Sequence, residues 1–174
     1  KITQRRRLLL NTLQLTSEGM QTVCGAARLV ECKEEYLITL ATPPVMSDEE
    51  RIMRLREHFA YCESRGFDED YPVGSILTKA SIEAGLFDQE DYVYSRIPRK
   101  VASPRLQIKP AGLYAQIDHK GSYDTILDSF LTLLDFIKKE GRAIAGDAYE
   151  YELLGYLAAG DPEKYVTRIS IYVR

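Results

Sequence analysis

The pattern Asp-x-Glu-x-Tyr-Val occurs twice in the chain, as Asp88-Gln89-Glu90-Asp91-Tyr92-Val93 and as Asp161-Pro162-Glu163-Lys164-Tyr165-Val166. The two copies lie 73 residues apart, and the same offset carries a predicted helix at about 48–65 onto another at about 121–138. A shared offset across several elements indicates one structural unit that is used twice. The duplication therefore guides the prediction of the fold.

The composition is that of an ordinary globular domain. A chain of 174 residues is long enough for one domain with a sizeable core and an appendage. No apolar run approaches the roughly 18 residues that span a membrane. The formal net charge of −3 argues against a nucleic-acid surface within this chain. We expect a cytoplasmic protein with no membrane partner.

The chain offers little for metal or catalytic chemistry. Cys24, Cys32 and Cys62 are odd in number and form no CxxC pair, which favours a reducing compartment. His58 and His119 stand alone, without the spacing of metal ligands. No P-loop, GxGxxG turn or nucleophile elbow is present. We therefore expect no metal, no cofactor and no catalytic residue.

The first segment, about 2–27, is predicted to be a helix. One face repeats small and apolar residues at the three-and-four spacing of a coiled-coil seam, namely Leu10, Leu13, Ser17, Met20, Cys24 and Ala27. Such a helix could pair with a partner helix or pack on its own domain. The pattern changes at Arg28, which we take as the start of a second region.

The region 28–174 is predicted to contain two halves, 29–100 and 105–174, each in the order β-α-β-β. The expected helices lie at about 48–65 and 124–140. The first expected strand contains Leu37, Ile38 and Leu40 and ends at Pro43-Pro44. The other expected strands cover 71–80, 89–97, 112–119, 148–157 and 165–173. Two such units form an α+β fold, with an antiparallel sheet, both helices on one face and a pseudo-twofold between the halves. A groove is expected between the helices.

One acid in the second half breaks the repeat. The offset makes Glu150 the counterpart of Leu77 in the other copy of the repeat, so a carboxylate stands at an otherwise apolar position. Alternation along the strand puts Glu150 and Glu152 on one face and Tyr149 and Tyr151 on the other. A carboxylate among aromatic walls suits a lipophilic cation, because charge attraction and cation–π attraction add.

Four further residues are candidates for the same groove. Tyr92 and Tyr165, as repeat partners, are expected to approach it from the two halves, and Leu55 and Phe59 on the first helix could close it. Each tyrosine could equally be a core residue with its hydroxyl satisfied at the rim. An acid could equally be an edge charge that faces water, and only strand phase supports Glu152.

Several runs in the second half resemble a known family. They are Lys109-Pro110-Ala111-Gly112-Leu113-Tyr114, Asp147-Ala148-Tyr149-Glu150, and Glu163-Lys164-Tyr165 with the following Arg168-Ile169-Ser170-Ile171. Their order and spacing resemble the effector-binding domain of GyrI-like proteins and of BmrR-like, MerR-family multidrug-responsive regulators. The resemblance covers about 105–173 clearly and 30–100 more weakly.

The resemblance implies roles for particular residues. It assigns the buried carboxylate that meets cationic drugs to Glu150, and it assigns Tyr165 and Tyr92 to the walls of the same pocket. Glu152 stands where the relatives have an apolar residue, which implies a more acidic pocket. Gly121 stands where they have an aromatic, which implies a more open one.

The resemblance also implies a role for the whole chain. It makes 1–27 the C-terminal part of a dimerisation helix and 28–174 the ligand-sensing domain of a bacterial transcriptional regulator. Lipophilic cationic or aromatic compounds would be the ligands, and no reaction would be catalysed. DNA would be bound by a domain outside this chain, in a homodimer. The alternatives are a stand-alone GyrI-like binding protein and a hydrolase that uses Glu150 as general base.

Overall fold

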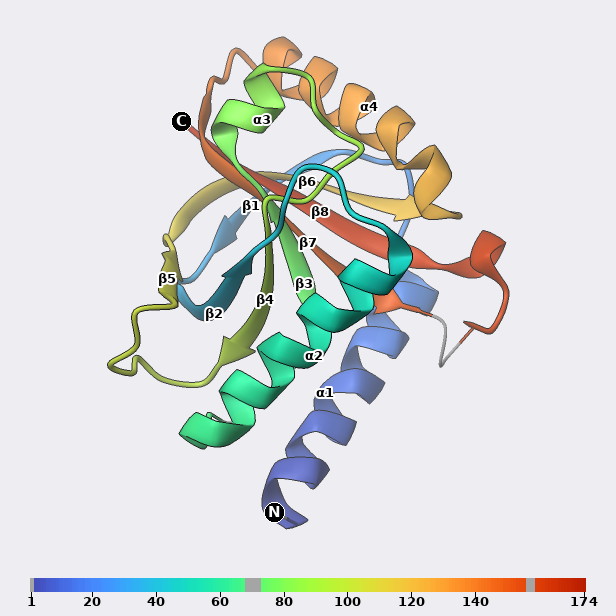
Figure 1. Cartoon of the computed structure of the whole chain (residues 1–174). Coiled ribbons are helices and arrows are strands. Elements are labelled where there is room, and N and C mark those ends of the chain that lie inside the picture. Colours follow the sequence, from blue (N-terminus) through green and yellow to red (C-terminus); the bar gives the residue numbers. More distant parts are fainter. Residues whose placement is uncertain (1, 68–72, 156–158) are drawn as a thin grey trace.

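One antiparallel sheet of eight strands organises the computed structural model (Figure 1), which describes residues 2–67, 73–155 and 159–174. The strands are β1 (Arg28–Cys32), β2 (Glu35–Ala41), β3 (Gly74–Leu77), β4 (Tyr92–Ile97), β5 (Leu106–Lys109), β6 (Gly112–Lys120), β7 (Ile144–Leu154) and β8 (Val166–Val173). The helices are α1 (Ile2–Gln21), α2 (Asp48–Arg65), α3 (Lys79–Glu83) and α4 (Ile126–Lys139), and the short turns are η1 (Tyr123–Thr125) and η2 (Pro162–Lys164). The fold class is α+β, as predicted.

The sheet is built from two equivalent halves. Its strand order is β1-β6-β8-β7-β3-β4-β2-β5, so the units β2-α2-β3-β4 and β6-α4-β7-β8 meet where β3 pairs with β7. The two outer strands are exchanged, because β1 pairs with β6 of the second half and β5 pairs with β2 of the first. The predicted duplication is confirmed, and this exchange was not predicted.

Both repeat helices cover the same face of the sheet. Phe130 and Leu133 of α4 pack with Ile169 and other strand residues in the largest core cluster, and Cys62 of α2 packs on Ile38 of β2. The opposite face carries tyrosines and the helix α1, whose Leu15 packs against Leu153 and Val166. We call these two sides the helix face and the tyrosine face.

Helix α2 has strong boundary signals and matches its prediction. Ser47 and Glu50 form a reciprocal capping box at its start, and Asp48 and Glu49 lie in the first turn. Acids here offset the positive end of the helix dipole. The helix ends at Gly66, which adopts the left-handed conformation with φ of 65°. These local signals fix the position of the side chains that point from α2 toward the sheet.

Some predicted boundaries were wrong. Helix α1 ends at Gln21 instead of residue 27, because Thr22 bonds to the Asp118 side chain and the Gly25 N–H donates to the Asp118 carbonyl. The strand predicted at 71–80 is β3, which ends at Leu77, and Thr78 then caps α3. Residues 71 and 72 lie outside the described residues, as do residues 156 and 157 of the strand predicted at 148–157.

The constant offset of 73 was also wrong for the strands. Tyr94 pairs with Gly74, so this offset would pair Thr167 with Asp147, but Thr167 pairs with Glu152. The strand pairs β3–β4 and β7–β8 therefore cannot both keep the offset of 73. The first half contains α3, which has no counterpart in the second, and this difference shifts the residue equivalence.

The shift separates the two tyrosines of the repeated pattern. Tyr92 is the first residue of β4 and pairs with Ile76, whereas Tyr165 ends the turn η2 and precedes β8. The two residues are therefore not counterparts in the sheet. The duplication holds for the order of the elements and fails for this pair.

Candidate ligand-binding site

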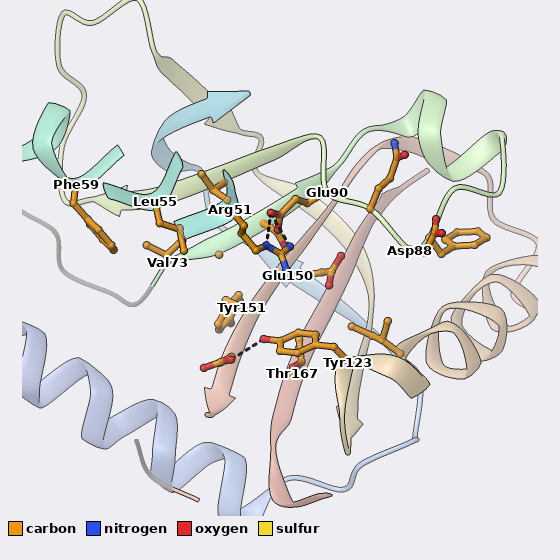
Figure 2. A pocket seen from close by; sticks show the side chains of 17 residues that line it. Arg51, Leu55, Phe59, Val73, Asp88, Glu90, Tyr123, Glu150, Tyr151 and Thr167 are labelled. Atoms are coloured by element: carbon orange, nitrogen blue, oxygen red, sulfur yellow. Dashed lines mark hydrogen bonds and ion pairs between the residues drawn. The ribbon is translucent and has the colours of Figure 1, made fainter. Parts of the chain in front are cut away.

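A cavity of about 500 Å³ opens on the helix face, between α2, η1 and the centre of the sheet (Figure 2). Four of the residues predicted from the sequence line it, namely Leu55, Phe59, Glu150 and Glu152. The structure thus brings these four together. The other lining residues are Arg51, Val73, Gly74, Ser75, Phe87, Asp88, Gln89, Glu90, Val93, Tyr123, Ile126, Tyr151 and Thr167.

Glu150 lies at the centre of the cavity wall. On β7 it pairs with Ser75 of β3 on one side and with Ile169 of β8 on the other, so its ladder neighbours are uncharged. Within the part of the chain that the structure describes, no side chain forms a hydrogen bond or ion pair with its carboxylate. Burial and, to a smaller extent, the charge of nearby Glu90 raise the pKa of Glu150 to about 8, and Arg51 opposes this shift.

The backbone of β7 is held at this position by a close aromatic contact. The hydroxyl of Tyr94 donates to the Glu150 carbonyl oxygen at 3.3 Å, from the tyrosine face. The Tyr94 ring lies over Gly74, where a Cβ atom would clash with both the ring and that carbonyl. Glycine is required at residue 74 because the strand and the ring approach each other there.

An ion pair spans the cavity beside Glu150. Arg51 of α2 binds Glu90, which precedes β4, with its NH2 and Nε atoms 2.7 and 3.1 Å from Oε1 of the acid (Figure 2). Glu90 is largely buried, with 13% of its side chain exposed, whereas Arg51 is 53% exposed. The charge of Glu90 is therefore already compensated by the protein, whereas no side chain among the described residues pairs with the carboxyl group of Glu150.

Glu152 has a neutral hydrogen-bond partner. The hydroxyl of Tyr123 donates to Glu152 Oε1 at 2.7 Å. Burial and the neighbouring carboxylate raise the pKa of Tyr123, so the phenol remains a donor. The turn η1 places this ring, because Gly121, with φ of 126°, and the N-cap Ser122 turn the chain after β6. Tyr123 thus orients Glu152 without neutralising it.

The structure does not bring Tyr92 and Tyr165 into the lining of this cavity. Tyr92 packs on the tyrosine face with Ile76, Tyr94 and Tyr149. Tyr165 lies at the end of η2, where its carbonyl accepts from the N–H of Gly121. A part for either tyrosine in ligand binding stays a prediction.

Among the polar residues of the cavity that sequence reasoning missed are Arg51, Glu90 and Tyr123. Arg51 precedes Leu55 and Phe59 at intervals of four, so the helical period already places it on their face. Glu90 is the glutamate of the repeated pattern itself. Tyr123 had no comparable signal, since its position depends on how the turn after β6 folds back over the sheet.

The described residues contain no group of three or more His, Cys, Asp or Glu side chains that could hold a metal ion. None of the described helices is long and apolar enough to cross a membrane.

The chain resembles a curated regulator over its full length. It is 20% identical over 174 residues to the multidrug-efflux transporter 2 regulator of Bacillus subtilis (strain 168). The match covers all of this chain and 63% of that protein. The chain therefore spans less than two thirds of this relative. No protein-family model matches it.

Solved structures share the fold. The EcmrR C-terminal domain aligns with a TM-score of 0.58 at 15% identity, covering 86% of this chain and 97% of that one. EcmrR in a cryo-EM complex with DNA aligns with a TM-score of 0.57 at 15% identity, covering 100% of this chain and 68% of that one. A structure described as a hydrolase from Listeria innocua aligns with a TM-score of 0.52 at 13% identity, covering 91% of this chain and 96% of that one.

The sheet and the helices on its one face form an α+β domain with the fold of the EcmrR C-terminal domain. The chain is similar to a multidrug-efflux transporter regulator and to the EcmrR C-terminal domain, in agreement with the resemblance to GyrI-like domains of MerR-type regulators stated from the sequence.

Proposed function

We propose that this domain senses lipophilic cations by binding them in the cavity on the helix face. One observation carries the proposal: Glu150 lies in a cavity of about 500 Å³ with no partner for its carboxylate among the described side chains. Leu55, Phe59 and Val73 give the same cavity an apolar wall. A ligand with one positive centre and a broad apolar body satisfies both features.

The energetics favour a cation over a neutral ligand of the same shape. Burying a carboxylate without a partner is costly, and a bound cation supplies the missing partner. An aromatic wall adds cation–π attraction of about 0.5–2 kcal/mol where water is excluded. The protein binds the ligand without a chemical step, and binding shifts the populations of two conformations.

The binding signal has a physical route to α1. Thr167 lines the cavity, and the next residue, Arg168, binds Glu18 of α1 at 3.2 Å. We propose that 1–27 is the C-terminal part of a dimerisation helix and that 28–174 is the effector-binding domain. In a longer homodimeric regulator, other domains would bind DNA and respond to the position of this helix.

A titration with ethidium, a fluorescent aromatic cation, tests the proposal. Glu150→Gln should weaken ethidium binding by about 30-fold or more, because losing one partner of a desolvated charge pair costs about 2–5 kcal/mol. The neutral probe N-phenyl-1-naphthylamine should bind the variant and the native protein alike. Glu140→Gln, an exposed acid just after α4, is the matched control and should change neither.

Equal losses for the charged and the neutral probe would mean that Glu150 acts through shape or folding. No loss for either probe would place the binding site elsewhere. A stand-alone GyrI-like binding protein would give the same titration, so only the presence of DNA-binding domains in the parent protein separates it from the regulator.

A hydrolase is the second candidate. A carboxylate with a pKa of about 8 suits a general base near neutral pH, and one fold neighbour is titled a hydrolase. Incubation with p-nitrophenyl acetate tests this candidate. If the protein releases nitrophenolate and Glu150→Gln abolishes this release, the domain is a hydrolase that uses Glu150. If release is no faster than in buffer, the hydrolase is contradicted and the ligand sensor is favoured.

A further inference from the structure

We propose that the cavity is built for dications, amphipathic molecules with two positive centres roughly 7 Å apart, one against Glu150 and the other against Glu152. This inference rests on the proposed function and names the class of ligand. Its basis is the arrangement of charge on one strand of the cavity wall.

The spacing follows from strand geometry. Glu150 and Glu152 are two residues apart on β7, so both side chains point to the helix face, and both line the same cavity. A strand rises about 3.3 Å per residue, which separates their Cα atoms by roughly 7 Å. Two carboxylates at this separation can each meet a different positive centre of one molecule.

The charge balance leaves both acids available. Of the four acids that line the cavity, Asp88 is exposed to solvent and Glu90 is neutralised by Arg51 at 2.7 Å. Glu152 accepts only the neutral hydroxyl of Tyr123, which fixes one oxygen and leaves the charge in place. In the described ranges, no lysine or arginine pairs with Glu150 or Glu152. A monocation would therefore compensate one of the two and leave the other.

Arg51, the one arginine among the described residues that line the cavity, supports the preference for dications. Arg51 lies beside Glu90 on the α2 side (Figure 2), so its charge is already used there. Glu152 lies toward η1, where Tyr123 and Thr167 supply only uncharged groups. The two positive centres of a ligand would thus lie along β7, with its apolar body facing Leu55 and Phe59 of α2.

Ethidium and propidium form a matched pair of probes. Both carry the same phenanthridinium ring, and propidium adds a quaternary ammonium on a propyl arm. Nucleic-acid-free protein should bind propidium at least about tenfold more tightly than ethidium at moderate salt. Glu152→Gln should lower propidium affinity about tenfold and ethidium affinity no more than about twofold.

Two further variants separate charge from shape. Tyr123→Phe removes the hydrogen bond to Glu152 but keeps the ring and the acid, so it should retain the preference for propidium. Glu140→Gln changes the net charge by the same amount as Glu152→Gln at an exposed position and should leave the ratio of affinities unchanged.

The possible failures are distinguishable. If ethidium binds and depends on Glu150 but propidium binds no better, the proposed function stands and the preference for dications is wrong. If Glu152→Gln lowers both affinities equally, Glu152 acts through packing and the inference fails. If neither probe binds, both the inference and the proposed function are contradicted.

Discussion

Glu150 makes the folded protein sensitive to pH. Burial raises its pKa from about 4.5 to about 8, so between these values the folded state binds a proton that the unfolded state releases. The charged groups around it are Glu90 and Arg51, which pair with each other, and Glu152, which Tyr123 holds. The native protein therefore loses stability as the pH rises through this window.

The variant Glu150→Gln should show this cost directly. It should match the native protein near pH 5 and exceed it by about 1–3 kcal/mol above pH 8, a range reduced for the partial solvent access of the side chain. Urea unfolding at pH 5, 7 and 9 measures the difference. A variant less stable than the native protein at pH 9 would show that the carboxylate has a stabilising partner.

Cation affinity should depend on the same ionisation of Glu150, but it should rise with pH where the stability of the folded protein falls. A cation prefers the ionised carboxylate, so below the pKa of about 8 each binding event must release a proton. Ethidium affinity should rise up to about tenfold per pH unit between pH 6 and 8 and then level off. Fluorescence titrations across this pH range measure the slope. If the affinity of the native protein is as independent of pH as that of Glu150→Gln, the prediction is wrong.

At the scale of elements, a buried cluster attaches α1 to the sheet. Asp118 of β6 is fully buried and accepts from Arg168 Nε and NH2 at 2.7 and 3.0 Å, from Arg28 at 2.8 Å and from Thr22. Burial alone would raise the pKa of Asp118, but the hydrogen bonds from Arg168 and Thr22 hold it below its ordinary value. Arg168 also binds Glu18 of α1.

Removing the charge of Asp118 should be costly. Asp118→Asn leaves two arginines without their buried counter-ion, and breaking a buried pair in this way costs about 3–5 kcal/mol. Asp135→Asn, an exposed acid on α4 that pairs with Lys139, is the control and should change stability by less than about 0.5 kcal/mol. Thermal unfolding of both variants measures the contrast, and equal effects would refute a structural role for the cluster.

Local signals explain which elements the sequence predicted. The capping box of Ser47 and Glu50 and the left-handed Gly66 fixed α2, and alternation along β7 placed Glu150 and Glu152 on one face. The strands β1 and β5 were missed because each pairs with the other half of the chain, and a local pattern carries no record of such pairing. Tyr92 was expected in the groove because a sequence offset was treated as a structural equivalence, and the strand registers differ.

At the scale of the whole molecule, α1 presents an apolar surface. Leu9, Leu10, Leu13 and Met20 are 55–75% exposed, while Leu15 on the other side packs on the sheet. The predicted seam residues Leu10, Leu13 and Met20 thus face solvent. Only a few heptad positions carry bulk, so we expect this chain alone to be a monomer or a weak dimer.

Sedimentation equilibrium at micromolar concentration tests this expectation. Weak self-association that Leu13→Glu abolishes would agree with a short coiled-coil seam. A tight dimer that resists Leu13→Glu would mean that another surface of the domain forms the interface.

A crystal structure of the protein with ethidium bound tests the central claim most directly. We predict that the ring lies in the cavity between α2 and β7, with its charged nitrogen facing the Glu150 carboxylate and its apolar edge against Leu55 and Phe59. Density on the tyrosine face around Tyr92, or in the cavity with the positive centre turned away from Glu150, would contradict a cation sensor built on this acid.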